Sequence, residues 1–206
     1  MDVLNAAFAG VVTFTALSIE TVVNDSWFVS RAGSSAYNQM YSALSVGDAR
    51  TLNVYIHAPY VRKKGDTLGL SGYPWEYLSD PTGDGISISY LTLPGGAFET
   101  YNQGKTLVHE AGHWLGLYHT FERPSPYKST SRRNNGCLGK GDWISDTPAE
   151  KTANYGCKPG RNTCPSKGKD PIHNYMDYSD DVCLTEFTPK QFTRIKKVWA
   201  AYRGVL

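Results

Sequence analysis

Apolar and polar positions recur with two different spacings along the first half of the chain. Helical spacing over residues 3–9 and 35–44 predicts two helices, and alternation over 11–19, 52–57 and 86–91 predicts three strands, the last of them half-buried. A third helix is expected over residues 103–115, because its apolar side chains recur at helical spacing and it stops at Gly116. The pattern therefore predicts a fold that combines helices with a sheet.

The second half of the chain lacks such periodicity. Pro, Gly, Ser, Asn, Lys and Cys dominate residues 123–181, which predicts a segment that is mostly loop. A last helix is expected from Thr188 and Pro189, with the proline at the first helical position.

Length and charge limit the classes of function. The 206 residues suit a single domain, and a formal net charge of +2 gives no electrostatic reason to expect a nucleic-acid partner. No apolar run reaches the roughly 18 to 20 residues that span a bilayer, so we expect no membrane partner. The polar N-terminus is not typical of a signal peptide, so a secreted protein would carry its export signal outside this sequence.

The four cysteines fall in the last third of the chain and contain no C-x-x-C spacing. This favours two disulfides in a secreted protein over a zinc knuckle, with free thiols in a cytosolic protein as the alternative. Spacing leaves all three pairings open. The sequon that begins at Asn24 also fits an exported protein.

One segment carries the chemistry. Residues 109–119 match H-E-x-x-H-x-x-G-x-x-H at every fixed position. Residues four apart lie on one helix face, so His109 and His113 are expected to bind one zinc ion. Gly116 would let the chain turn so that His119 becomes the third ligand, which leaves a position for water. Glu110 is expected to act as the general base for that zinc-activated water.

This segment and its flanks resemble the metzincin clan of zinc peptidases, and within it the pappalysin family, particularly its secreted fungal-type members. The resemblance covers residues 3–204, and its strongest pieces lie at residues 51–55, 93–96, 109–121, 141–150 and 173–178. It implies an α+β, zincin-like catalytic domain. A twisted mixed sheet and the active-site helix would form an upper subdomain (1–116), and a loop-rich, disulfide-held lower subdomain (117–206) would carry the third ligand.

The resemblance also implies roles for residues outside the motif. Met176 would form the floor of the site, and Tyr178 would donate its hydroxyl to the developing oxyanion, with plain packing in the wall as the alternative. Calcium is suggested near Asp142, Asp146 and Thr147, although these residues could instead cap turns. The implied disulfides join Cys137 to Cys164 and Cys157 to Cys183.

We therefore expect a secreted, monomeric zinc endopeptidase that acts on proteins or peptides. The alternatives are a zinc-binding but inactive peptide-recognition module and a zinc hydrolase of another amide or ester. The basic segment 123–135 is expected to be a solvated loop, and Asp177, Asp180 and Asp181 either a solvated turn or a site that favours basic side chains. His57 and His173 are expected to be structural.

Overall fold

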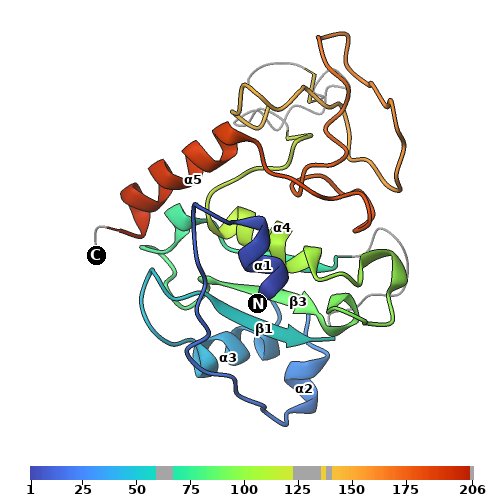
Figure 1. Cartoon of the computed structure of the whole chain (residues 1–206). Coiled ribbons are helices and arrows are strands. Elements are labelled where there is room, and N and C mark those ends of the chain that lie inside the picture. Colours follow the sequence, from blue (N-terminus) through green and yellow to red (C-terminus); the bar gives the residue numbers. More distant parts are fainter. Residues whose placement is uncertain (59–66, 123–135, 138–140, 205–206) are drawn as a thin grey trace.

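The fold is that of a computed structural model, which describes residues 1–58, 67–122, 136–137 and 141–204. Its sheet has three strands in the order β1-β3-β2 (Figure 1), with β1 at Asn53–His57, β2 at Gly69–Ser71 and β3 at Gly85–Ser89. Strand β1 pairs with β3 in parallel, and β2 pairs with β3 in antiparallel. The mixed sheet agrees with the expected α+β class.

The central strand β3 is buried over all five of its residues, so the expectation of a half-buried strand was wrong. Ile86 and Ile88 face the apolar core that contains α4. Ser87 on the other face meets the ring of His57, with 2.7 Å between its Oγ atom and Nε2. A polar side chain can be buried at low cost when it has such a partner, so alternation of residue type did not indicate exposure here.

Helices cover both faces of the sheet. Helix α4 (Lys105–Trp114) packs on β2 and β3, and α1 (Asp2–Ala7) packs on α4. The opposite face is covered by α3 (Ser35–Leu44), and the short helix α2 (Asp25–Phe28) lies beside α3 (Figure 1). Tyr41 of α3 stacks near Tyr55 of β1, with 4.1 Å between ring centroids. Ser34 caps α3 by accepting a hydrogen bond from the Tyr37 N–H, so this helix begins where the sequence indicated.

The strand predicted over residues 11–19 does not form. The Asn5 side chain accepts a hydrogen bond from the Phe14 N–H at 2.8 Å and donates one to the Phe14 carbonyl at 3.0 Å. It therefore occupies the groups that a strand would offer to a neighbour. The sequence also missed β2, which is only three residues long and contains glycine and serine.

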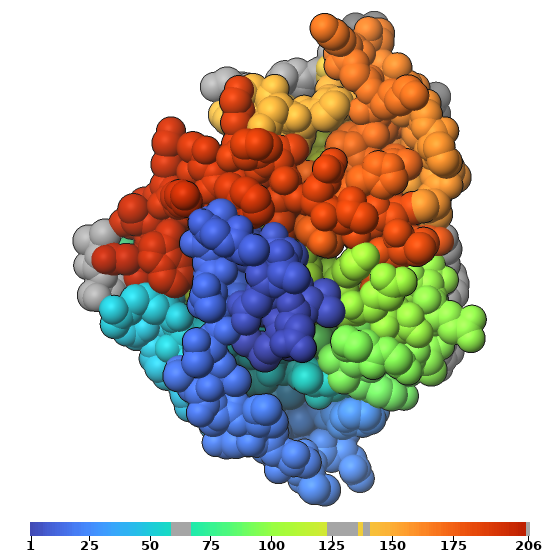
Figure 2. All heavy atoms as spheres, viewed as in Figure 1, coloured from blue at the N-terminus to red at the C-terminus, as the bar shows by residue number. Residues whose placement is uncertain are grey.

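Between α4 and the last helix, α5 (Pro189–Tyr202), the part of the chain that the structure describes is irregular, as predicted. Its disulfides join Cys137 to Cys164 and Cys157 to Cys183, the pairing that the family resemblance implies. Thr188 caps α5. In Figure 2 the N-terminal residues lie against this C-terminal part, where the Phe8 and Phe187 rings are 4.8 Å apart. The division into subdomains at residue 116 stays a prediction.

The end of α5 is tied to the rest of the chain by the buried side chain of Arg203. Its guanidinium makes two hydrogen bonds to the Asp84 carboxylate, at 2.8 and 2.9 Å, and donates others to the carbonyls of Trp114 and Ala49. This contact fixes the C-terminal end of α4 against α5. Within the described ranges, the helices are too short or too polar to cross a bilayer.

Candidate metal centre

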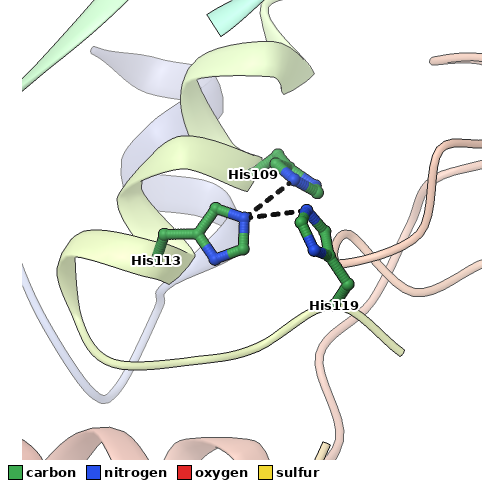
Figure 3. Close-up of side chains that lie close together, drawn as sticks. All are labelled: His109, His113 and His119. Atoms are coloured by element: carbon green, nitrogen blue, oxygen red, sulfur yellow. Dashed lines mark hydrogen bonds between the residues drawn. The ribbon is translucent and has the colours of Figure 1, made fainter. Parts of the chain in front are cut away.

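Helix α4 presents His109 and His113 from successive turns, and the chain reverses directly after it. Gly116 has a φ of +93°, a conformation that favours glycine. The reversal brings His119 back to the other two imidazoles, so that all three rings point to one place (Figure 3). The structure thus brings together the three histidines that the sequence motif singled out.

The three Nε2 atoms converge. The Nε2 atom of His113 lies 3.2 Å from that of His109 and 3.1 Å from that of His119. On the far side of the rings, the His109 Nδ1–H donates to the Tyr175 carbonyl at 2.7 Å, and the His113 Nδ1–H donates to the Leu117 carbonyl at 2.8 Å. These outer hydrogen bonds leave the Nε2 lone pairs of both rings directed inward.

This donor set fits a zinc ion. Two nitrogens that are each about 2.0 to 2.1 Å from a tetrahedral zinc lie about 3.3 Å apart, close to the separations found here. Lone pairs that face each other at such distances repel unless a cation lies between them. Among the described residues, these three histidines are the only group of His, Cys, Asp or Glu side chains that converges in this way.

Burial keeps two of the imidazoles neutral. It lowers the pKa of His109 to about 3 and that of His113 to well below its usual value, with smaller contributions from the neighbouring histidines. Neutral imidazole is the form that binds a metal. The site is therefore ready to accept a cation without first losing protons from these two rings.

Glu110 lies beside the imidazoles on α4 and is only 7% exposed. Burial raises the pKa of its carboxyl to about 8, and no described residue hydrogen-bonds the carboxylate. A bound cation would lower that pKa again, because it favours the charged form. The carboxylate is thus free to exchange a proton with a small molecule in the site.

Met176 lies under the helix, fully buried. Its Sδ atom occupies the space that a side chain at Gly112 would need. The Met176 N–H donates to the Asn174 side chain at 3.0 Å, and its carbonyl accepts from the Thr120 N–H at 3.2 Å. The turn at Met176 is therefore held both to the helix and to the segment that carries His119.

The side chain of Tyr178 also lies at the histidine cluster. Its hydroxyl is 3.0 Å from the Nε2 atom of His119, and its ring is 5.0 Å from that imidazole. Burial raises the pKa of this phenol, and the carboxylate of Glu110 raises it further. The phenol therefore stays protonated, and it lies near enough to Glu110 for the charge of that carboxylate to affect it.

Several residues that support this geometry were given no role by the sequence analysis, although Phe121 and Asn174 lie in segments that carry the resemblance. Phe121 stacks on His119 at 4.7 Å, and Tyr73 contacts His113 edge-on at 5.4 Å. Asn174 and Gln191 exchange two hydrogen bonds between their buried side-chain amides. Asn174 and Gln191 lie many positions apart in the sequence, so local spacing carries no signal that they form a pair.

The acidic residues on either side of Tyr178 do not form a solvated turn, so that alternative was wrong. Asp177 and Asp181 are each 1% exposed, whereas Asp180 is partly exposed. The Asp181 carboxylate accepts hydrogen bonds from the backbone N–H groups of Gln103 and Lys105, at the start of α4. The Asp177 carboxylate likewise accepts from the Asn154 N–H and the Ser179 hydroxyl. A site that favours basic side chains stays a prediction.

The candidate calcium residues have protein partners. Asp142 accepts hydrogen bonds from the Thr147 hydroxyl and the Ile144 N–H. Asp146 accepts from the Thr188 hydroxyl and the Lys190 N–H, at the start of α5. These contacts are those of the turn-capping alternative, and calcium stays a prediction. The segment 123–135 lies outside the described residues.

His57 and His173 are structural, as expected. His57 is buried against Ser87, and His173 lies 2.8 Å from the Cys183 carbonyl through Nδ1. Both rings are bonded to the fold and lie outside the histidine cluster.

A comparison with known protein families identifies the family of this chain. The sequence pattern of Peptidase_M43, the pregnancy-associated plasma protein-A family, matches residues 37–200. The chain belongs to this peptidase family. Members of it are metzincins, which agrees with the fold and with the three-histidine cluster.

Curated relatives share much of this sequence. An extracellular metalloprotease of Podospora anserina is 43% identical over 98% of this chain and 64% of its own length. An extracellular metalloprotease of Neurospora crassa is 44% identical over 98% of this chain and 65% of its own length. The chain thus spans slightly less than two thirds of these relatives.

Solved structures show the same fold. Mirolysin in complex with compound 9 matches with a TM-score of 0.68 and 28% identity over 85% of this chain and 63% of its own. Mature mirolysin of Tannerella forsythia in complex with a cleaved peptide matches with a TM-score of 0.63 and 30% identity, over 79% and 58%.

Proposed function

We propose that this chain is the catalytic domain of an extracellular zinc endopeptidase. The observation that carries the proposal is the convergence of three Nε2 atoms beside a buried carboxylate that no described residue hydrogen-bonds. His109, His113 and His119 would hold the zinc. Three protein ligands with a further position open are typical of catalytic rather than structural zinc.

When bound, zinc supplies a Lewis acid that lowers the pKa of water toward neutrality and polarises a peptide carbonyl. Glu110 would accept the proton of the attacking water and pass it to the leaving amine. Among the residues that the structure describes, none hydrogen-bonds this carboxylate, which supports that role. The buried phenol of Tyr178 would donate a hydrogen bond to the carbonyl oxygen as negative charge develops on it.

The surroundings would serve the same reaction. The carbonyls of Tyr175 and Leu117 orient two imidazoles through their Nδ1 atoms, and Met176 packs beneath the helix that carries them. Such outer contacts fix the direction of each ligand before the metal arrives. The aromatic rings of Phe121 and Tyr73 pack against His119 and His113 and would limit the contact of these imidazoles with water.

Location and substrate follow from the relatives and the disulfides. The curated relatives are named extracellular metalloproteases, and two disulfides suit an oxidising compartment. One structural neighbour was solved with a cleaved peptide. We infer that this chain is secreted and cleaves proteins or peptides as a monomer. An inactive peptide-recognition module is the second candidate, but it would have no use for Glu110.

Digestion of a peptide library by the zinc-loaded chain tests the proposal. We expect new cleavage products, their loss after chelation and their return with added zinc. His119→Ala should abolish cleavage, whereas His173→Ala, which alters a histidine outside the cluster, should retain it. Binding of peptides by the zinc-loaded chain without any cleavage would support the recognition module and overturn the proposal.

A further inference from the structure

Gly69 lies on β2 against the side chain of the proposed general base. A Cβ atom built at this glycine would come within 2.7 Å of both Cγ and Oε1 of Glu110, and within 3.0 Å of Cδ. Real Cβ atoms do not approach other atoms so closely. The absence of a side chain at residue 69 therefore defines the space that the Glu110 carboxylate occupies.

Backbone conformation does not explain this glycine. Gly69 is not among the residues with positive φ, so alanine could adopt its conformation. It lies within a strand, where glycine ordinarily weakens the pairing and often marks a close approach by another group. The group that approaches here is the side chain of Glu110.

Neither of the two backbone segments that carry this contact, β2 and α4, can retreat easily. On the strand side, the Ser89 N–H donates to the Leu68 carbonyl at 2.8 Å, and the Gly72 N–H donates to the Gly85 carbonyl at 3.2 Å. These bonds hold β2 to β3 on both sides of Gly69. A methyl group at residue 69 would therefore press on its neighbour and would not displace the strand.

Helix α4 is held as firmly. Its start is bound by the carboxylate of Asp181, and the carbonyl of Trp114 at its end accepts two hydrogen bonds from Arg203. The Glu110 side chain, in contrast, has rotatable bonds and no hydrogen bond from a described residue. The carboxylate is the part that would move.

We propose that Gly69 is a positioning residue, which sets the place of the Glu110 carboxylate by packing. The inference rests on the proposed function. Because the carboxylate is oriented without hydrogen bonds, its oxygen lone pairs stay available for the proton that it is proposed to transfer. A small residue on the neighbouring strand is then what fixes its distance from the imidazoles.

Gly69→Ala tests this in the zinc-loaded full chain. We expect kcat to fall about 100-fold, since misplacing a catalytic group by about 1 Å costs on that order, while KM and zinc content stay close to those of the wild type. The matched control is Leu70→Ala, the next residue of the same strand, whose side chain is 40% exposed. It should keep kcat. Full activity in Gly69→Ala, or a rise in KM alone, would overturn the inference.

A stability cycle tests the same contact without turnover. Gly69→Ala should lower Tm by about 2 to 8 °C through overpacking, and this penalty should vanish in a Glu110→Ala background, where the crowded atoms are gone. A penalty that persists in that background would show that the methyl group meets something else. If the wild-type chain cleaves no peptide, the proposed function fails, while this cycle still decides whether the contact exists.

Discussion

Gly112 of helix α4 leaves the space that the Sδ atom of Met176 fills. In a helix, replacing glycine with alanine usually stabilises, by about 0.5 to 1 kcal/mol. Here the added methyl group would overlap the sulfur, so the sign should reverse. The contact joins the helix that carries His109 and His113 to the turn beneath them.

We expect Gly112→Ala to lower the free energy of unfolding by about 1 to 3 kcal/mol, the usual cost of overpacking. Chemical denaturation measures it. Adding Met176→Ala should recover part of the loss caused by Gly112→Ala, because the overlapping atoms are removed. A stabilised Gly112→Ala variant would show that the sulfur is not held against the helix.

Much of this site could be predicted because its chemistry is local. The three converging histidines and Glu110 fall within residues 109–119, and helix geometry converts the spacing of His109 and His113 directly into convergence. The contacts at Gly69 and Gly112 could not be predicted, since each joins segments far apart in sequence and depends on the absence of a side chain.

The same distinction between local spacing and distant contacts explains which helices and strands could be predicted. Helices α3 and α5 begin directly after Ser34 and Thr188, whose side chains cap them, and both starts agree with the sequence prediction. Residues 11–19 have the alternation of a strand, but the side chain of Asn5 bonds the backbone of Phe14 and prevents pairing there. Tertiary contacts of this kind override a local preference for strand.

Arg203 provides a test of how the helices are locked together. Its guanidinium is buried, pairs with Asp84 and serves the Trp114 carbonyl. Arg203→Met should lower the free energy of unfolding by about 3 to 5 kcal/mol, because it leaves a carboxylate buried without its partner. Urea denaturation measures the change.

The control for Arg203 is Arg50→Ala, which removes an ion pair to Asp48 whose side chains are 58% and 47% exposed. Exposed pairs contribute little, so no measurable change is expected. Equal losses in the two variants would show that burial of the Arg203 pair has no special effect.

His57 should make stability depend on pH. Burial lowers the pKa of its imidazole below the ordinary value of about 6.5. Below that pH the unfolded chain therefore binds more protons than the folded one, and stability falls as pH drops from about 6.5 toward the lowered pKa. Above about 6.5 this loss is absent.

Urea denaturation of His57→Gln and wild type between about pH 4.5 and 7.5 measures this effect. Both proteins carry the three clustered histidines, so the difference between their pH profiles isolates His57. We expect the wild type to lose more stability than the variant on acidification, in the window below about 6.5. Parallel profiles would contradict a buried, neutral His57.

The central claim is that Glu110 transfers the proton in a site held by three histidines. The measurement that tests it most directly is peptide hydrolysis by Glu110→Gln, with the zinc content of the same sample determined. Glutamine keeps the shape of the side chain but cannot accept the proton. We predict one bound zinc per chain and a kcat lower by at least about 100-fold, the range for general-base catalysis. Hydrolysis near the wild-type rate by the zinc-loaded variant would contradict the account.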